Sequence, residues 1–338
     1  MSQAVPLTPS GVATALIAKI WLSSMVLFAI VCPAHAGPVV NFPGYTMQRL
    51  VTGAGSVDGL AISPSGDLYF TDYGGGRVLK VTDPASGTDK AFSIVASGIF
   101  AATDLAFNNT GQLFVTSSTG GASPLLQVFS NGSTSVFASG FSFPTSVAAH
   151  GTNLFVTDSG DGTIRRVDSS GGVHDFLSGY GNGNGPYGAS FDSLGDLFFT
   201  HHGTGQVYEA DPSGGVQLLG TLSPLGATFT GVGPGDHLFV SDVLAGTVYT
   251  RDASGTLVPF VSGLVGKANP PAIGPTGIVF DGQGNMYIGD GPNIWRVSGP
   301  TFFEAREPSA MMLAIVGCGG LLGCRLISHR GMLHLGGH

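Results

Sequence analysis

The stretch Asp67-Leu68-Tyr69-Phe70-Thr71-Asp72 decides the fold, because closely similar strings return at regular intervals along the chain. The later copies are QLFVTS from Gln112, NLFVTD from Asn153, DLFFTH from Asp196, HLFVSD from His237 and NMYIGD from Asn285. The second residues of successive copies lie 41 to 48 residues apart. A period of this length is typical of propeller blades or of helical arrays.

The contents of each unit favour blades over helices. In the first unit, the short apolar run Gly59–Ile62 precedes the repeated string, and the runs Arg77–Val81 and Ser93–Ala96 follow it, with Gly-containing turns between them. Four such runs describe four antiparallel strands. The chain has 55 Gly and 20 Pro in 338 residues, and no run is long enough for the helices of an array. The sequence therefore predicts an all-β protein of four-stranded blades.

The two ends of the repeat region complement each other. The sixth unit has only three clear strands, the last reaching Trp295-Arg296-Val297, whereas the stretch Tyr45–Thr52 precedes the first unit without a partner. We expect this N-terminal strand to supply the missing outer strand of the sixth blade, because a closed ring leaves no exposed sheet edge. The prediction is a six-bladed β-propeller over residues 37–305.

The sequence of the repeated unit, most clearly PTGIVFDGQGNMYI from Pro275 to Ile288, resembles that of the NHL-repeat and SMP-30/gluconolactonase group of propellers. The resemblance spans nearly the whole repeat region. It implies the six-bladed fold, which hosts binders, scaffolds, lyases and lactonases. For the SMP-30-like lactonases it also implies a divalent metal held by a set of Glu, Asn and Asp.

Charge and cysteine content exclude several classes of function. The net charge is −8 and no cluster of Lys or Arg lies in the middle of the chain, so we expect no nucleic-acid partner. Cys32, Cys318 and Cys324 lie near the ends, so neither a disulfide framework nor a cysteine-ligated zinc site supports the propeller. We expect a monomer.

The N-terminal residues predict export. Lys19 precedes the apolar run Ile20–Val31, and Ala34-His35-Ala36 then provides an Ala-x-Ala cleavage site. This order is typical of a signal peptide over residues 1–36, removed by signal peptidase. A transmembrane helix is the weaker alternative, because about 20 apolar residues are needed to span a bilayer.

The C-terminal residues 306–338 contain Glu307-Pro308-Ser309, the apolar run Ala310–Gly323 and the basic residues Arg325 and Arg330. This arrangement resembles the PEP-CTERM sorting signal of Gram-negative bacteria, with a short transmembrane segment and a basic tip. The resemblance implies transient anchoring in the inner membrane and cleavage near Glu307 by a PEP-CTERM sortase. It also implies a final location at the cell surface or outside the cell, in a setting of exopolysaccharide production.

Candidate site residues follow from the geometry of a blade, in which the start of the first strand and the end of the second open on one face. We expect the first-strand starts to form a ring at the mouth of the central channel, with Asp104 one residue further in; its members are Asp58, Thr103, Thr145, Tyr187, Thr230 and Thr276. The threonines favour hydrogen bonds over metal ligation. Asp58 is the ring's candidate metal ligand.

A second ring is expected at the second-strand ends, and its members are Asp72, Ser117, Asp158, His201, Asp242 and Asp290. A repeated Asp at a strand end is typical of a side chain that caps the next turn through backbone N–H groups. His201-His202 interrupts this pattern in one blade, where Tyr187 starts the neighbouring strand. Histidine there is a candidate general base or metal ligand, the alternative being an exposed turn pair without a role.

The sequence thus predicts an exported binding module for an extracellular carbohydrate or protein ligand. The alternative is an SMP-30-like, metal-dependent lactonase that uses one divalent cation (Ca, Mg or Zn), with Asp58 and His201 as candidate metal ligands. No catalytic residue is assigned. The candidate ligand-binding residues at the channel mouth are Asp58, Asp104, Tyr187, His201, His202, Asp242 and Asp290.

Overall fold

A computed structural model describes residues 37–119, 121–181, 184–264 and 274–300. The expected signal peptide and sorting signal both lie outside these residues. Within the described part of the chain, no helix is long and apolar enough to cross a membrane.

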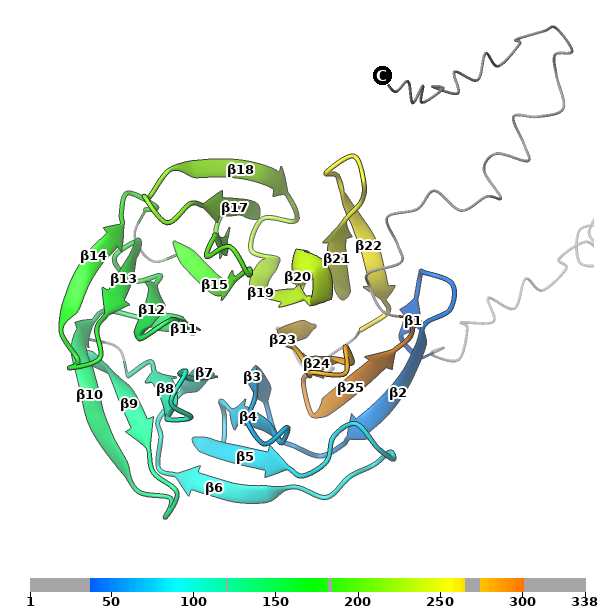
Figure 1. Cartoon of the computed structure of the whole chain (residues 1–338), viewed down its shortest axis with the longest axis horizontal. Helices are drawn as coiled ribbons and strands as arrows, with labels where there is room; N and C mark the ends of the chain where they lie inside the picture. Colours follow the sequence, from blue (N-terminus) through cyan, green and yellow to red (C-terminus); the bar gives the residue numbers. More distant parts are fainter. Residues whose placement is uncertain (1–36, 120, 182–183, 265–273, 301–338) are drawn as a thin grey trace, which may run out of the picture.

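The described residues form six antiparallel sheets arranged as blades around a central channel (Figure 1). From the channel outward, blade one consists of β3 Val57–Ile62, β4 Leu68–Asp72, β5 Arg77–Val81 and β6 Ser93–Ser97. Blade two consists of β7 Ala102–Phe107, β8 Leu113–Ser117, β9 Ser123–Val128 and β10 Thr134–Phe141. Blade three consists of β11 Pro144–His150, β12 Asn153–Asp158, β13 Thr163–Val167 and β14 Val173–Leu177. Blade four consists of β15 Pro186–Phe191, β16 Leu197–His201, β17 Gln206–Ala210 and β18 Val216–Thr221. Blade five contains β19 Ala227–Gly233, β20 His237–Asp242, β21 Thr247–Arg251 and β22 Leu257–Ser262. Blade six consists of β23 Pro275–Phe280, β24 Met286–Asp290, β25 Asn293–Ser298 and β2 Thr46–Val51. The predicted all-β, six-bladed propeller is confirmed.

The N-terminal strand closes the ring as expected. Strand β2 pairs antiparallel with β25, with Met47 opposite Val297 and Arg49 opposite Trp295. Figure 1 shows β2, in blue, alongside β25, in orange. A feature that the sequence did not predict is β1, Val39–Val40, which pairs with β22 as a fifth strand of blade five. The first residues of the described chain therefore join two neighbouring blades.

The core lies between the blades, and it is built from the repeated strings. Their central residues are buried on both faces of the second strands β4, β8, β12, β16, β20 and β24. Aromatic rings fill the gaps between strands and blades; for example, Phe239 packs edge-on to Phe260 with centroids 5.1 Å apart. Such buried apolar and aromatic surface supplies most of the driving force for folding.

Glycine is required where the inner strands of neighbouring blades approach each other most closely. A Cβ at Gly277 would lie 2.6 Å from the carbonyl oxygen of Asp58, and one at Gly188 would overlap the backbone of Phe229. These inner strands can therefore converge on the channel only without a side chain at those positions.

Aspartate side chains cap several of the turns between strands. The Asp168 carboxylate accepts backbone hydrogen bonds from Ser170 and Gly172, both at 2.9 Å. Asp211, Asp252 and Asp281 repeat the same pattern in other turns. Much of the acidic charge of the chain is thus explained by turn geometry.

Deleting residues 37–55 should leave the outer edge of β25 unpaired and remove the buried side chains of Leu50 and Val51. We expect aggregation or loss of cooperative thermal unfolding, because an exposed edge strand templates association. Size-exclusion chromatography and circular dichroism melting measure both effects. Val39→Ala is the control, since Val39 is 55% exposed and its removal should leave the melt unchanged. A soluble deletion variant that melts like the parent would contradict closure by β2.

Candidate functional site

A cavity of about 470 Å³ lies at the channel mouth, where the inner strands begin. We name it the mouth cavity. Its polar side chains include those of Asp58, Tyr73, Tyr187 and His202. Apolar side chains supply much of the remaining wall, namely Val57, Phe143, Leu225, Val243 and Leu244. A cavity of this volume with few polar groups on apolar walls is typical of a small-molecule site.

The threonine hydroxyls around the mouth are used to hold the blades together. Thr145 Oγ1 donates to the carbonyl of Tyr187 at 2.9 Å, and Thr276 Oγ1 donates to the carbonyl of Val57 at 3.1 Å. Thr103 Oγ1 bonds the carbonyl of Pro144 at 3.2 Å. Each of these bonds joins one blade to the next. The expectation that the threonines serve hydrogen bonding is therefore confirmed.

One member of the predicted ring was wrong. Ala227 pairs with Asp242 in the way that Val57 pairs with Asp72, so Thr228 is the fifth-blade member of the ring. Thr230, two residues further along β19, lies lower in the channel and accepts a hydrogen bond from Ser190 Oγ at 2.8 Å.

Asp58 stands apart from the rest of the ring. Its carboxylate lines the mouth cavity, and no hydrogen bond or ion pair joins it to another residue that the structure describes. Burial among protein atoms raises the pKa of this carboxyl well above its ordinary value, and the neighbouring charge of Asp104 raises it further. The mouth thus contains a carboxyl group whose charge the described protein does not stabilise.

Asp104 lies deeper, on the wall of a second cavity of about 290 Å³ that we name the lower cavity. Its carboxylate accepts hydrogen bonds from Ser146 Oγ at 2.5 Å and from the backbone N–H of Val147 at 3.1 Å and Leu105 at 2.8 Å. Burial nevertheless dominates, and the pKa of Asp104 rises to about 6. These bonds tie β7 to β11, so Asp104 has a structural role at the channel wall.

Tyr187 and His202 form one side of the mouth cavity. Their ring centroids are 5.0 Å apart, and Tyr187 also packs edge-on to Phe229 at 5.6 Å. His202 Nδ1 lies 3.2 Å from the carbonyl of Ala227, which places the proton of the neutral ring on Nδ1. Burial lowers the pKa of His202 and raises the pKa of Tyr187. The nearby Asp58 and Tyr73 raise the pKa of Tyr187 further. Both side chains are therefore neutral at physiological pH.

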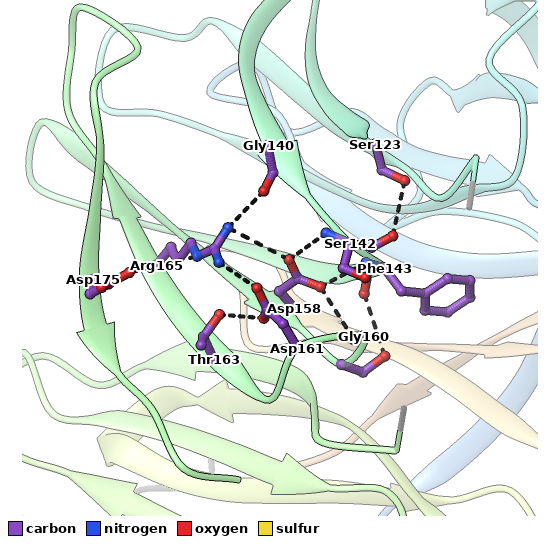
Figure 2. A network of polar contacts seen from close by, with 11 residues as sticks. Ser123, Gly140, Ser142, Phe143, Asp158, Gly160, Asp161, Thr163, Arg165 and Asp175 are labelled. Atoms are coloured by element: carbon purple, nitrogen blue, oxygen red, sulfur yellow. Dashed lines mark hydrogen bonds and ion pairs between the residues drawn. The ribbon is translucent and has the colours of Figure 1, made fainter. Parts of the chain in front are cut away.

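The second predicted ring forms turns. Figure 2 shows the fully buried Asp158 carboxylate accepting backbone hydrogen bonds from Ser142 and Phe143, both at 2.7 Å, and from Gly160 at 3.2 Å. The guanidinium of Arg165 lies 3.9 Å from the same carboxylate. Asp158 thus joins the β10–β11 connection to its own turn, as the capping interpretation predicts.

His201 takes the place of this Asp in blade four. Its Nε2 donates to the carbonyl of Tyr180 at 2.7 Å, and its Nδ1 accepts from the backbone N–H of Thr204 at 3.3 Å. Asp72 and Asp242 make the same kind of bond to the N–H three residues on, at Gly75 and Ala245. His201 does not line the mouth cavity.

Of the remaining candidate residues, Asp242 accepts from the backbone of Ser223, Leu244 and Ala245, and Asp290 accepts from Trp295 Nε1 at 3.1 Å. The structure therefore brings Asp58, Tyr187 and His202 together at the mouth. It places His201, Asp242 and Asp290 in the turns behind it. Tyr73 and Leu225, which also line the mouth, were not among the candidates. Tyr73 follows Asp72 as His202 follows His201, so the repeat could have indicated it, whereas Leu225 lies in the β18–β19 loop outside the repeated string.

The described side chains do not fit the divalent metal that the lactonase resemblance implies. Among the residues 37–119, 121–181, 184–264 and 274–300, no group of three His, Cys, Asp or Glu side chains is placed to hold a metal ion. On the mouth wall Asp58 has threonine and tyrosine as ring neighbours, and the hydroxyls of Thr103, Thr145 and Thr276 are engaged with backbone carbonyls.

No protein-family model matches the sequence, and no curated protein matches it. Solved structures do match in fold. A gluconolactonase from Xanthomonas campestris aligns with a TM-score of 0.63 at 15% identity, covering 78% of this chain and 95% of the other. Virginiamycin B lyase from Staphylococcus aureus, with quinupristin, gives 0.54 at 13% identity over 75% and 99%. The chain in a nidogen/laminin complex gives 0.55 at 16% identity over 70% and 98%. These likenesses define the chain as a six-bladed β-propeller of this architecture.

Asp158→Ala and His201→Ala should both lower stability while leaving the mouth cavity intact. Asp158→Ala leaves buried backbone N–H groups without a hydrogen-bond acceptor, so we expect the free energy of unfolding to fall by about 2 to 4 kcal/mol. His201→Ala removes two partly exposed hydrogen bonds, and we expect a loss of about 1 kcal/mol. Urea unfolding measures both changes. An unchanged unfolding curve for His201→Ala would show that its turn contacts contribute nothing.

Asp58→Asn should stabilise the protein, and increasingly so as the pH rises. A carboxyl with a raised pKa holds its proton longer in the folded state than in the unfolded state, so its contribution to stability falls as the pH rises above the unfolded value. We expect the unfolding free energy of the variant, relative to the parent, to increase between about pH 4 and about pH 8. Urea unfolding at both pH values measures this, and a difference that does not change with pH would contradict the burial of an unpartnered carboxyl.

Proposed function

We propose that the protein is an exported binding module that takes part of its ligand into the mouth cavity. The observation that carries this proposal is the mouth cavity itself, which is open at one end of the channel and has apolar walls around the carboxylate of Asp58, a group that the described residues leave without a partner. Carrying such a group costs stability, and proteins tolerate that cost at functional sites.

The rim of the mouth supports binding of a larger ligand. Exposed apolar side chains surround the mouth on the same face of the propeller, namely Tyr73, Phe100, Leu225 and Leu244. Leu225 has a left-handed backbone conformation, with φ of 62°, which is costly for a bulky residue. Its N–H bonds the carbonyl of His202 at 2.8 Å, so this strained residue is fixed beside the cavity.

The cellular location of the protein is proposed from the sequence signals at its two ends. A signal peptide at residues 1–36 and a PEP-CTERM-like signal at residues 306–338 would send the propeller to the cell surface or beyond it, after processing by signal peptidase and a sortase. The ligand would then be an extracellular carbohydrate or protein.

A lactonase is the second candidate, although the described side chains do not fit the metal that the resemblance implies for it. The observation that favours it is the acid–base set at the mouth, in which burial raises the pKa of Asp58 and lowers that of His202. A δ-gluconolactone assay with added Ca²⁺ or Zn²⁺ separates the two candidates. A binding module gives no hydrolysis above the uncatalysed rate, whereas turnover that is lost in Asp58→Asn would favour the lactonase.

Leu244→Arg should abolish ligand capture by placing a charged side chain over the mouth. Leu244 is 58% exposed, so its substitution should leave the fold intact. Binding is measured on a glycan array and on extracellular polysaccharide and proteins of the producing bacterium. We expect at least a tenfold loss of affinity for the ligand that the parent captures.

Leu194→Arg is the matched control. Leu194 is 78% exposed and lies in the turn between β15 and β16, at the opposite end of the channel from the mouth. It should bind like the parent. Equal losses in both variants, or no loss in either, would contradict a ligand site at the mouth.

A further inference from the structure

The half-buried carboxylate of Asp58 is treated differently from the buried carboxylates of the propeller. Asp72, Asp104 and Asp158 each accept hydrogen bonds from at least two groups of the protein. Asp58 accepts none from the described residues, although its side chain lines the mouth cavity. A carboxylate that is half-covered by apolar walls and unpaired by the described residues gains from a partner outside the protein that replaces its lost hydration.

The charge of the channel points to a cation as the missing partner. No Lys or Arg among the described residues lines either cavity, whereas Asp58 and Asp104 both do. The basic side chains of Arg77 and Arg165 are engaged instead with carboxylates at the β4–β5 and β12–β13 turns. The field inside the channel therefore favours a positively charged group and disfavours an anion.

The remainder of the mouth cavity favours an organic cation over a metal ion. Tyr73, Phe143 and Tyr187 present aromatic surface around Asp58, and Leu225 and Leu244 add aliphatic surface. Aromatic rings attract ammonium groups, and apolar walls gain from covering hydrocarbon. A metal ion would find one carboxylate here and would leave these walls uncovered.

We propose that the mouth cavity selects small organic ligands that bear a protonated amine on an apolar body, with the ammonium group at Asp58. The ammonium supplies the hydrogen-bond donors that this carboxylate lacks, and the apolar body covers the walls. The volume of about 470 Å³ accommodates a ligand of one or two rings. This inference rests on the proposed function, because it names the ligand class of the same cavity.

The test compares three probes that share a phenyl ring and differ in charge: phenethylamine, 2-phenylethanol and 3-phenylpropionate. Their affinities for the purified protein are measured by calorimetry. We expect the amine to bind at least tenfold more tightly than the alcohol, and the carboxylate to bind weakest. In Asp58→Asn the amine and the alcohol should bind within about twofold of each other, because the charge that distinguishes them is gone.

Asp175→Asn is the matched control, because it removes the same charge from a side chain that is 84% exposed in the outer strand of blade three. It should retain the preference for the amine. An equal loss of preference in both variants would mean that overall charge, rather than Asp58, selects the amine, and would overturn the inference.

Other outcomes separate this inference from the proposed function. If the alcohol binds as tightly as the amine and both are lost in Leu244→Arg, the mouth is a binding site but its selectivity for amines is wrong. Displacement of the amine by Ca²⁺ or Zn²⁺ at one ion per protein, dependent on Asp58, would make an inorganic cation the occupant. If no probe binds at millimolar concentration, the inference fails, and the capture experiment with Leu244→Arg still judges the proposed function.

Discussion

The channel depends on hydrogen bonds made by a hydroxyl group at the fifth position of the repeated string, which five of the six copies contain. Thr71 Oγ1 accepts the backbone N–H of Gly59 in its own blade at 2.8 Å and donates to the carbonyl of Thr103 in the next blade at 3.0 Å. Thr157 and Thr200 make the same double contact further round the ring. A buried hydroxyl that hydrogen-bonds the backbones of two neighbouring inner strands sets the distance between them. These bonds therefore determine the shape of the mouth.

Much of the fold was predictable because each sequence repeat corresponds to one blade. Each copy of the string defines a second strand, and the incomplete sixth unit required Tyr45–Thr52 as its fourth strand, which the structure confirms in β2. Strand β1 was missed, since two residues carry no periodic pattern and their partner β22 is distant in sequence. The assignment of Thr230 failed because threonine occurs at both positions 228 and 230, and only the pairing of Ala227 with Asp242, followed by a register shift, shows which of them starts the strand.

The candidate site was predictable in part. Asp58 and Tyr187 replace threonine in a ring of equivalent positions, so the sequence itself marks them. The separation of His201 from His202 was not visible, because His201 is the last residue of β16 and bonds the turn, whereas His202 enters the mouth wall. The lack of a partner for Asp58 also depends on residues from several blades. Single-sequence patterns do not report such long-range relationships.

The mouth cavity contains the carboxylate of Asp58, for which the described residues provide no hydrogen-bond or ion-pair partner. Carbon-13 NMR of aspartate side-chain carboxyl groups tests this arrangement most directly, with Asp58→Asn used to assign the resonance. We expect the pKa of Asp58 to lie well above the ordinary range of aspartate, and the pKa of Asp104 to be about 6. An Asp58 resonance that titrates near pH 4, at about the value of a free aspartate, would contradict it.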